Sequence, residues 1–203
     1  MSLFQIDWKK GGGLAPAIVQ HADTGEVLML GYMNAKALDE TQTRGLVTFW
    51  SRSKERLWTK GESSGNTLSL VSVATDCDSD AILVRARPAG PTCHTGSHSC
   101  FGETPGPEIG FLGQLQHVID TRAEDDPEDS YTAKLLSKGV LKCAQKVGEE
   151  GVETALAAAA EDDDALLGEA ARLIFHLMVT LKARGLSLAD VTALLAQRHA
   201  AKG

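Results

Sequence analysis

The hydrophobic pattern divides the chain into two halves with different periods. Between residue 15 and about residue 87, apolar residues come in short runs rich in β-branched and aromatic side chains, which is typical of strands. These runs cover residues 17–20, 27–32, 46–50, 68–75 and 82–84. One helix is expected among them, beginning at a capping Asn34 and ending at Gly45, where a left-handed backbone is easily adopted. The first half is therefore predicted to be an α+β domain rich in strands.

The second half shows helical periods. Apolar residues recur three and four positions apart, which predicts helices over residues 111–122, 131–138, 140–160, 165–184 and 188–199. Gly139 and Gly185 end the second and the fourth of these helices, and Ser187 caps the last one. The second half is therefore predicted to be an all-α helical bundle.

A short segment between the two halves suits neither helix nor central strand. Residues 102–107 contain two glycines and two prolines. We therefore predict two domains, the first of residues 1–104 and the second of residues 111–203, with a linker of residues 105–110.

Composition narrows the classes of function. The 203 residues, 43% of them hydrophobic and 23% charged, suffice for two small cores. A net charge of −7 argues against a nucleic-acid scaffold or a partner of anionic membranes, and an anionic substrate would need bound cations or a local basic pocket. No apolar run approaches the roughly 18 residues of a membrane span, and residues 1–10 lack the apolar core of a secretion signal. We expect a cytoplasmic location.

An acidic segment follows the run of residues 68–75. Residues 76–80 place carboxylates at alternate positions, so a continued strand would point them to one face and Cys77 to the other. Such like charges repel unless a cation joins them, which favours Mg²⁺, although a solvated acidic loop is the alternative. An EF-hand loop is excluded because Ala81 and Arg87 stand where it needs Gly and Glu. The candidate ligands are Asp76, Asp78 and Asp80.

The cysteines suggest a second metal. In a reducing compartment, clustered thiols more often bind metal than form disulfides. Cys93 and Cys100 flank a glycine-containing loop with His94 and His98, and the spacing differs from the Cys-x-x-Cys of structural zinc sites. With Cys77, three thiols would suit a catalytic zinc with one open position. Buried cysteines beside surface histidines are the alternative interpretation.

Several blocks of the first half resemble the phosphoribosyl-AMP cyclohydrolases. They are residues 27–34, 49–53, 57–66, 76–80 and 93–101, in the order in which that family has them. The resemblance implies zinc on Cys77, Cys93 and Cys100, and Mg²⁺ on Asp76, Asp78 and Asp80. It also implies a homodimer with a zinc site shared between two subunits, and hydrolysis of the N1–C6 bond in the adenine ring of phosphoribosyl-AMP.

The chemistry of that reaction points to further residues. Zinc lowers the pKa of a bound water toward about 7, and attack at C6 parallels the zinc deaminases. His94 is our candidate for proton transfer, with His98 left open. Trp50 and Trp58 fit a core as well as they fit a nucleotide contact. The candidates for binding the substrate are Trp50, Arg52, Ser53, Lys60, Ser64, Gly65 and Asn66.

The helical half carries its own acidic set. Glu150 and Glu153 lie three apart on one helix face and Glu169 lies on the next long helix, so they can hold Mg²⁺ or form a solvated stripe. Residues 130–136, 145–150, 153–155, 169–171 and 176–177 resemble the all-α, Mg²⁺-dependent phosphoribosyl-ATP pyrophosphohydrolases. The resemblance implies Mg²⁺ on the three glutamates, and Lys134 and Lys146 are candidates for binding phosphates.

One residue departs from that family's pattern. The family has Glu-x-x-Glu followed by Glu-x-x-Asp, whereas this chain has Arg172 at the last position. Either Arg172 turns away and pairs with Glu169, or it weakens the Mg²⁺ site. A bifunctional enzyme is therefore the main hypothesis, and a cyclohydrolase whose helical half serves dimerisation is its alternative. A third hypothesis is a non-catalytic interaction protein stabilised by tetrahedral zinc with no exchangeable water.

Overall fold

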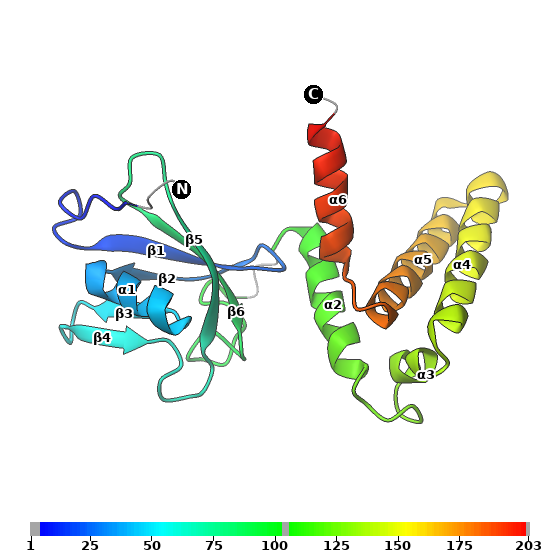
Figure 1. Ribbon diagram of the computed structural model, residues 1–203, viewed down its shortest axis with the longest axis horizontal. Helices are drawn as coiled ribbons and strands as arrows, with labels where there is room; N and C mark the ends of the chain where they lie inside the picture. The colour runs from blue at the N-terminus through cyan, green and yellow to red at the C-terminus, as the bar shows by residue number, and fades with distance from the viewer. Residues whose placement is uncertain (1–4, 103–105, 202–203) are drawn as a thin grey trace. The chain divides into compact units, whose positions relative to one another are not determined.

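The chain folds into two compact units. The computed structural model describes residues 5–102 and 106–201, and the division falls between Leu112 and Gly113 (Figure 1). The first unit is α+β and the second is all-α, as the hydrophobic pattern predicted. Part of the glycine- and proline-rich boundary, residues 103–105, lies outside the described residues. Within the predicted linker, Glu108–Gly110 forms a short 3-10 helix.

A four-stranded sheet forms the centre of the first unit. Its strands are ordered β2 (Val27–Met33), β1 (Ala15–His21), β6 (Ile82–Pro88) and β5 (Leu68–Thr75). β1 pairs antiparallel with β2 and parallel with β6, and β5 pairs antiparallel with β6. The sheet therefore joins the first two strands of the chain to β5 and β6, which follow α1, β3 and β4 in the sequence.

A helix and a hairpin complete this unit. α1 (Ala35–Arg44) begins where the Asn34 side chain accepts a hydrogen bond from the Ala37 amide, and ends at Gly45 with φ 68°, both as predicted. β3 (Thr48–Ser51) and β4 (Arg56–Thr59) form a separate antiparallel pair. The prediction did not include β4. In Figure 1 this hairpin lies beside α1, in agreement with the contacts between α1, β2 and β3.

The core lies on one face of the sheet. Alternate residues of β1 and β6 are buried there, as a half-buried strand requires. Phe49 is fully buried over Gly31 of β2, where a Cβ would overlap its ring, and it stacks on Trp58 with centroids 5.6 Å apart. The core residues are Ala15, Ala17, Val19, Leu28, Met29, Met33, Ala37, Leu38, Val47, Phe49, Leu68, Ile82, Val84 and Ala86.

The opposite face of the sheet carries an exposed apolar row. Ile18 is in register with Leu30 of β2 on one side and with Leu83 of β6 on the other. These three side chains point to the same face because registered partners do so. Each of them is more than a third exposed.

The second unit is built on a helical hairpin. α4 (Val140–Ala160) and α5 (Asp163–Ala183) pack along their length and are joined by only two residues (Figure 1). α3 (Tyr131–Ser137) packs against both of them, and α2 (Phe111–Arg122) and α6 (Leu188–Ala200) complete the unit.

Helix caps fix the boundaries of this unit. The Ser130 hydroxyl accepts from the Ala133 amide at the start of α3, and the Asp162 carboxylate accepts from the Ala165 amide at the start of α5. Ser187 and Asp190 form a capping box on α6. The described helices include no candidate for a bilayer-spanning segment.

Candidate active sites

A pocket of about 400 Å³ in the first unit gathers many of the predicted residues. It opens between the loop of residues 91–100 and the turn after β4. His94 and two of the predicted zinc ligands lie in its wall together with three of the predicted substrate residues. The lining residues are Met29, Trp58, Lys60, Gly61, Glu62, Ser63, Ser64, Asn66, Pro91, Thr92, Cys93, His94, Gly96 and Cys100.

Backbone hydrogen bonds hold the thiol-bearing loop in place. The loop turns back on itself because the Cys93 amide donates to the Ser97 carbonyl at 3.0 Å and Gly96 adopts φ 89°. It is tied to β2 because the Cys100 amide donates to the Leu28 carbonyl at 2.8 Å. Both thiols therefore project from a loop anchored to the central sheet.

The two thiols have different acidities. The Thr95 hydroxyl donates to Cys93 Sγ at 3.1 Å, and this bond with further donors in the loop lowers the pKa of Cys93 to about 6. Burial, followed by the charge of Cys93, raises the pKa of Cys100. Cys93 is thus a thiolate at neutral pH, the form in which cysteine binds a metal or attacks an electrophile.

The two histidines of the loop have different surroundings. His94 lines the pocket, and its Nδ1 lies 3.8 Å from Cys93 Sγ. His98 lies outside the pocket lining, and its Nδ1 is 2.8 Å from Oε2 of the buried Glu26. The His98 ring also stacks on His21, with centroids 6.0 Å apart. His98 therefore ties the loop to the β1–β2 hairpin, and His94 is the imidazole that a pocket ligand would meet.

Lys60 brings a buried positive charge to the pocket. It is 8% exposed, and its ammonium donates to the Asn66 carbonyl at 3.1 Å. Among the described residues it has no carboxylate partner within 4 Å, so two of its three donors are left for another acceptor. A buried cation with spare donors is suited to an anionic or strongly polar ligand.

Other predicted substrate residues lie elsewhere. Trp50, Ser53 and Gly65 do not line the pocket, and the Arg52 guanidinium lies over the Tyr32 ring, 3.9 Å from its centroid. Trp58 does line the pocket, although it was absent from our candidates. The sequence did not decide whether Trp58 is a core residue or a nucleotide contact. In the structure its ring stacks on the buried Phe49 and also lines the pocket, so it belongs to both core and pocket.

The acidic segment gathers three carboxylates through a turn. β5 ends at Thr75, so the strand does not continue through the acidic segment and its alternation does not align the carboxylates. Asp76 instead accepts hydrogen bonds from the amides of Asp80 and Ala81 at 3.0 and 3.1 Å, and Ser79 takes a left-handed φ of 62°. Ligand oxygens of Asp76, Asp78 and Asp80 all lie within 4.8 Å of one another. Clustered carboxylate oxygens are a donor set that suits Mg²⁺.

Cys77 is exposed in the middle of this turn. In the described part of one chain, the Sγ atoms of Cys77, Cys93 and Cys100 do not all lie within 4.8 Å of one another, whereas ligand oxygens of the three aspartates do. A single chain thus presents the three predicted zinc ligands in two places.

The second unit presents its acids across the α4–α5 hairpin. Ligand oxygens of Glu150, Glu153 and Glu169 lie within 4.8 Å of one another. Glu150 is 4% exposed, and its Oε2 and that of Glu169 are buried with no hydrogen-bond partner among the described residues. Two buried, unpaired carboxylate oxygens are costly unless a cation joins them. This donor set therefore fits Mg²⁺.

A polar network supports Glu150. Lys146 Nζ lies 3.2 Å and His176 Nδ1 lies 3.3 Å from Glu150 Oε1. The His176 Nδ1 also faces the Arg172 carbonyl at 3.0 Å, and its Nε2 lies 3.0 Å from the Tyr131 hydroxyl. Because both neighbours of Nδ1 are acceptors, Nδ1 carries a hydrogen. Tyr131 and His176 were not among our candidates as site residues.

The basic residues of the second unit are distributed unevenly. Lys146 Nζ contacts Glu149 at 2.7 Å, a bond that raises the pKa of Lys146, and it reaches Glu150 as well. Lys134 is exposed on α3 and has no ion pair in the described structure. Arg172 is 62% exposed and pairs with Glu169, Nη1 to Oε1 at 2.7 Å. Of the two outcomes considered for Arg172, the pairing with Glu169 is the one observed.

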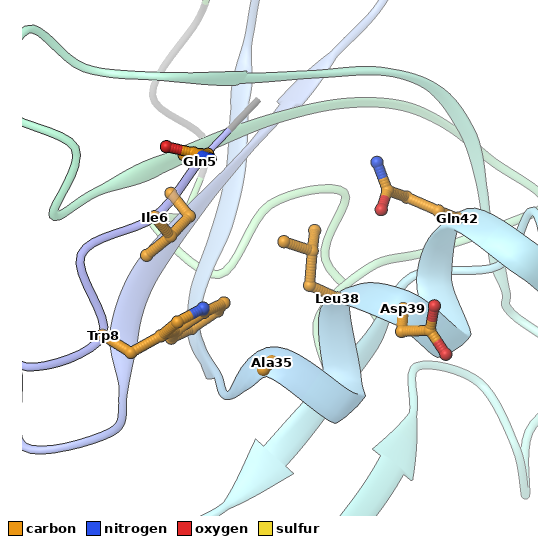
Figure 2. A pocket seen from close by; sticks show the side chains of 7 residues that line it. All are labelled: Gln5, Ile6, Trp8, Ala35, Leu38, Asp39 and Gln42. Carbon is orange, nitrogen blue, oxygen red and sulfur yellow. The ribbon is translucent and has the colours of Figure 1, made fainter. Parts of the chain in front are cut away.

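A second pocket of the first unit contains none of the predicted residues. It has a volume of about 450 Å³, and Figure 2 shows Ile6 and Trp8 of the N-terminal segment opposite Ala35 and Leu38 of α1. Its polar lining residues are Gln5, Asp39 and Gln42. A single carboxylate beside two amides offers no constellation for catalysis.

Comparison with known proteins identifies both halves. A family model described as phosphoribosyl-AMP cyclohydrolase matches residues 29–102, and one described as phosphoribosyl-ATP pyrophosphohydrolase matches residues 112–199. The chain is 61% identical over 197 residues to the histidine biosynthesis bifunctional protein HisIE of Xanthomonas axonopodis pv. citri, covering 97% of this chain and 94% of that protein. It is 57% identical over 195 residues to the HisIE protein of Escherichia coli K12, covering 96% of each. The chain belongs to the HisIE family.

Membership in the HisIE family decides between the hypotheses drawn from the sequence. The family combines a phosphoribosyl-AMP cyclohydrolase domain and a phosphoribosyl-ATP pyrophosphohydrolase domain in histidine biosynthesis, which agrees with the main hypothesis. The match over residues 112–199 does not support a helical half that serves dimerisation alone. Both domains are hydrolase domains, so a non-catalytic interaction protein is not supported either.

Proposed function

We propose that the second domain removes pyrophosphate from phosphoribosyl-ATP and that the first domain opens the adenine ring of the resulting phosphoribosyl-AMP. The observation that carries the proposal is the pocket of about 400 Å³ whose lining includes Lys60, Cys93, His94 and Cys100. It combines a thiolate, an imidazole and a buried cation around a space suited to a small molecule.

In the first domain, Cys93 and Cys100 would hold zinc together with Cys77. When bound, zinc supplies a water acidified for attack on the purine C6. His94, in the pocket wall, takes and returns the proton, and Lys60 binds the substrate phosphate with Ser64 and Asn66 beside it. The contact between Glu26 and His98 helps to position the loop.

The zinc site would be completed by a second subunit. The separation of Cys77 from the other two thiols within one chain supports a site shared in a homodimer. The exposed row of Ile18, Leu30 and Leu83 gives the sheet an apolar face that a second copy would cover. Mg²⁺ on the turn of residues 76–80 would offset its negative charge beside Cys77.

In the second domain, Glu150, Glu153 and Glu169 would hold Mg²⁺ between α4 and α5. When bound, Mg²⁺ neutralises phosphate oxygens and so favours cleavage of the triphosphate. The network of Lys146, His176 and Tyr131 keeps Glu150 in place, and Lys146 and Lys134 offer positive charge to the phosphates. The unpaired oxygens of Glu150 and Glu169 support the metal assignment.

One assay tests both assignments. The zinc-loaded protein is given phosphoribosyl-ATP with Mg²⁺, and pyrophosphate and the ring-opened product are followed separately. We expect Cys93→Ser to abolish ring opening while pyrophosphate is still released. Glu150→Gln should abolish pyrophosphate release while added phosphoribosyl-AMP is still opened.

The fourth cysteine gives a matched control. Cys143 is buried in the second unit and belongs to neither proposed set of metal ligands, so Cys143→Ser should leave both products unchanged. Full ring opening by Cys93→Ser, or full pyrophosphate release by Glu150→Gln, would contradict the corresponding assignment.

A further inference from the structure

A lysine far away in the sequence lies against the acidic turn. Lys10 Nζ donates to Asp78 Oδ2 at 2.9 Å and lies 3.8 Å from Asp80 Oδ2. It also donates to the Asp78 backbone carbonyl at 2.6 Å. In the described parts of the chain, no other cationic side chain lies within 4 Å of these aspartates. A single ammonium thus faces three clustered carboxylates.

A backbone contact holds this lysine in place. The Asp7 amide donates to the Ser79 carbonyl at 2.7 Å, so residues 7–10 lie along the turn of residues 76–80. The chain then turns back through three glycines, with the Gly13 amide bonded to the Trp8 carbonyl at 2.7 Å, before it enters β1. We call residues 7–10 the N-terminal strap.

We propose that Lys10 is an internal counter-cation for this turn, and that Mg²⁺ binding displaces its ammonium from Asp78 and Asp80. The inference rests on the proposed Mg²⁺ site. It adds that Lys10 influences how tightly Mg²⁺ binds there. Mg²⁺ needs oxygens at about 2.0–2.1 Å in near-octahedral geometry, and it repels a neighbouring ammonium. The two cations therefore compete for the same carboxylate oxygens.

The competition has two opposite consequences. Without Mg²⁺, Lys10 reduces the repulsion among Asp76, Asp78 and Asp80 and so stabilises the turn and the strap. When Mg²⁺ arrives, part of its binding free energy is spent on displacing Lys10, so its apparent affinity is lower than the carboxylates alone would give. Lys10 thereby allows the turn to fold without metal and keeps the metal exchangeable.

The test measures Mg²⁺ binding directly. MgCl₂ is titrated calorimetrically into the full-length, zinc-loaded protein, in a Glu150→Gln, Glu153→Gln background that removes two acids of the second domain. We expect Lys10→Met to lower the Kd for Mg²⁺ roughly fivefold. This is the change in affinity that corresponds to the free energy of one exposed ion pair. The matched control is Lys9→Met, which removes the same charge from an exposed neighbour that has no ion pair in the described structure.

Thermal unfolding supplies a second readout. Without added Mg²⁺, Lys10→Met should melt at a lower temperature than the parent, and saturating Mg²⁺ should cancel the difference. A residue with only a structural role would lower the melting temperature in both conditions. Lys10→Gln keeps a donor for the Asp78 carbonyl but lacks the charge, so it gives the same comparison if Lys10→Met folds poorly.

The outcomes separate the inference from the proposed function. If Asp78→Asn leaves the Mg²⁺ isotherm unchanged, no Mg²⁺ site exists at the turn, and both fail. If Asp78→Asn weakens binding but Lys10→Met and Lys10→Gln leave the Kd unchanged, only the role of Lys10 is overturned. An equal gain in Lys9→Met would also overturn it, because general charge would then explain the effect.

Discussion

Arg172 stands where the metal-ligand pattern of the pyrophosphohydrolases has an aspartate. It lies one helical turn from Glu169 and binds one oxygen of that carboxylate, while the other oxygen is buried and unpaired. An arginine cannot relieve repulsion from Mg²⁺ by losing its proton. Because Arg172 is largely exposed, its side chain is able to swing into solvent, away from the carboxylates.

We predict that Arg172→Asp strengthens the second site. The change removes a cation and adds a carboxylate on the face of Glu169, so at limiting Mg²⁺ pyrophosphate release should rise about tenfold, or about 1.4 kcal/mol. Pyrophosphate formed from phosphoribosyl-ATP at several Mg²⁺ concentrations measures this. Arg172→Ala removes only the cation and should give part of the gain, and ring opening should not change. If neither variant improves on an already efficient parent, Arg172 instead helps to bind the phosphates.

For individual residues, the sequence predicted site residues that lie close together along the chain, and it missed contacts between residues that are far apart along the chain. Cys93, His94 and Cys100 share one pocket because they share one loop. The contact of Lys10 with Asp78 spans 68 residues and depends on the strap, which no periodicity indicates. Tyr131 and His176 are likewise 45 residues apart and meet only because α3 packs against the helical hairpin.

Among the elements of the first unit, the turn after β1 is fixed to β6 by an ion pair. The Arg87 guanidinium binds both oxygens of Asp23, each at 2.8 Å. This bond holds the pKa of Asp23 below its ordinary value. Because the folded pKa is the lower one, the pair stabilises the fold above the unfolded pKa, and this contribution is lost as the pH falls through the folded value.

We predict a pH-dependent cost for Asp23→Asn. At pH 7 the variant should lose about 0.5–1 kcal/mol of unfolding free energy, a range that allows for solvent screening of an exposed pair. The difference from the parent should shrink as the pH falls below about 4, where the carboxylate begins to protonate in the unfolded chain, and should vanish below the lower pKa of the folded protein. Urea unfolding at several pH values measures it. Asp39→Asn, at an exposed helix position with no ion pair in the described structure, is the control and should show no such trend.

The elements that the pattern predicted best are those with strong periods. α4 and α5 follow from apolar spacing, and α1 from its two caps. β4 was missed because its four residues include a single aliphatic side chain and follow a charged turn in which Glu55 has φ 47°. Strand order was beyond prediction too, since the parallel pairing of β1 with β6 depends on packing across the whole unit.

On the scale of the whole molecule, the negative charge of the chain has to coexist with anionic substrates. Six of the acids form two clusters that metals would neutralise, and Lys60 supplies a buried cation in the pocket proposed for the substrate. A net charge of −7 is thus compatible with nucleotide binding, because salt screens distant charges and a bound nucleotide is affected mainly by the charged groups near its site.

The proposed sharing of zinc between subunits makes a prediction about mixtures. Cys77→Ser and Cys93→Ser proteins should each lack ring opening, because every site then misses one ligand. In a hybrid dimer, one site combines the intact Cys77 of one chain with the intact loop of the other. Free exchange at equal amounts should therefore restore about a quarter of the parent activity, since half the dimers are hybrids and each has one complete site.

The matching control mixes Cys93→Ser with Cys100→Ser. Both changes lie on the same loop, so each site of a hybrid dimer still has one defective loop, and no activity should return. Ring opening after subunit exchange, with exchange verified by a mass tag on one protein, measures both mixtures. Rescue in the first mixture alone is the result expected of a shared site. Absence of rescue in both, despite complete exchange, would place all three thiols around a zinc within one chain, and Cys77 would then have to move to reach the other two.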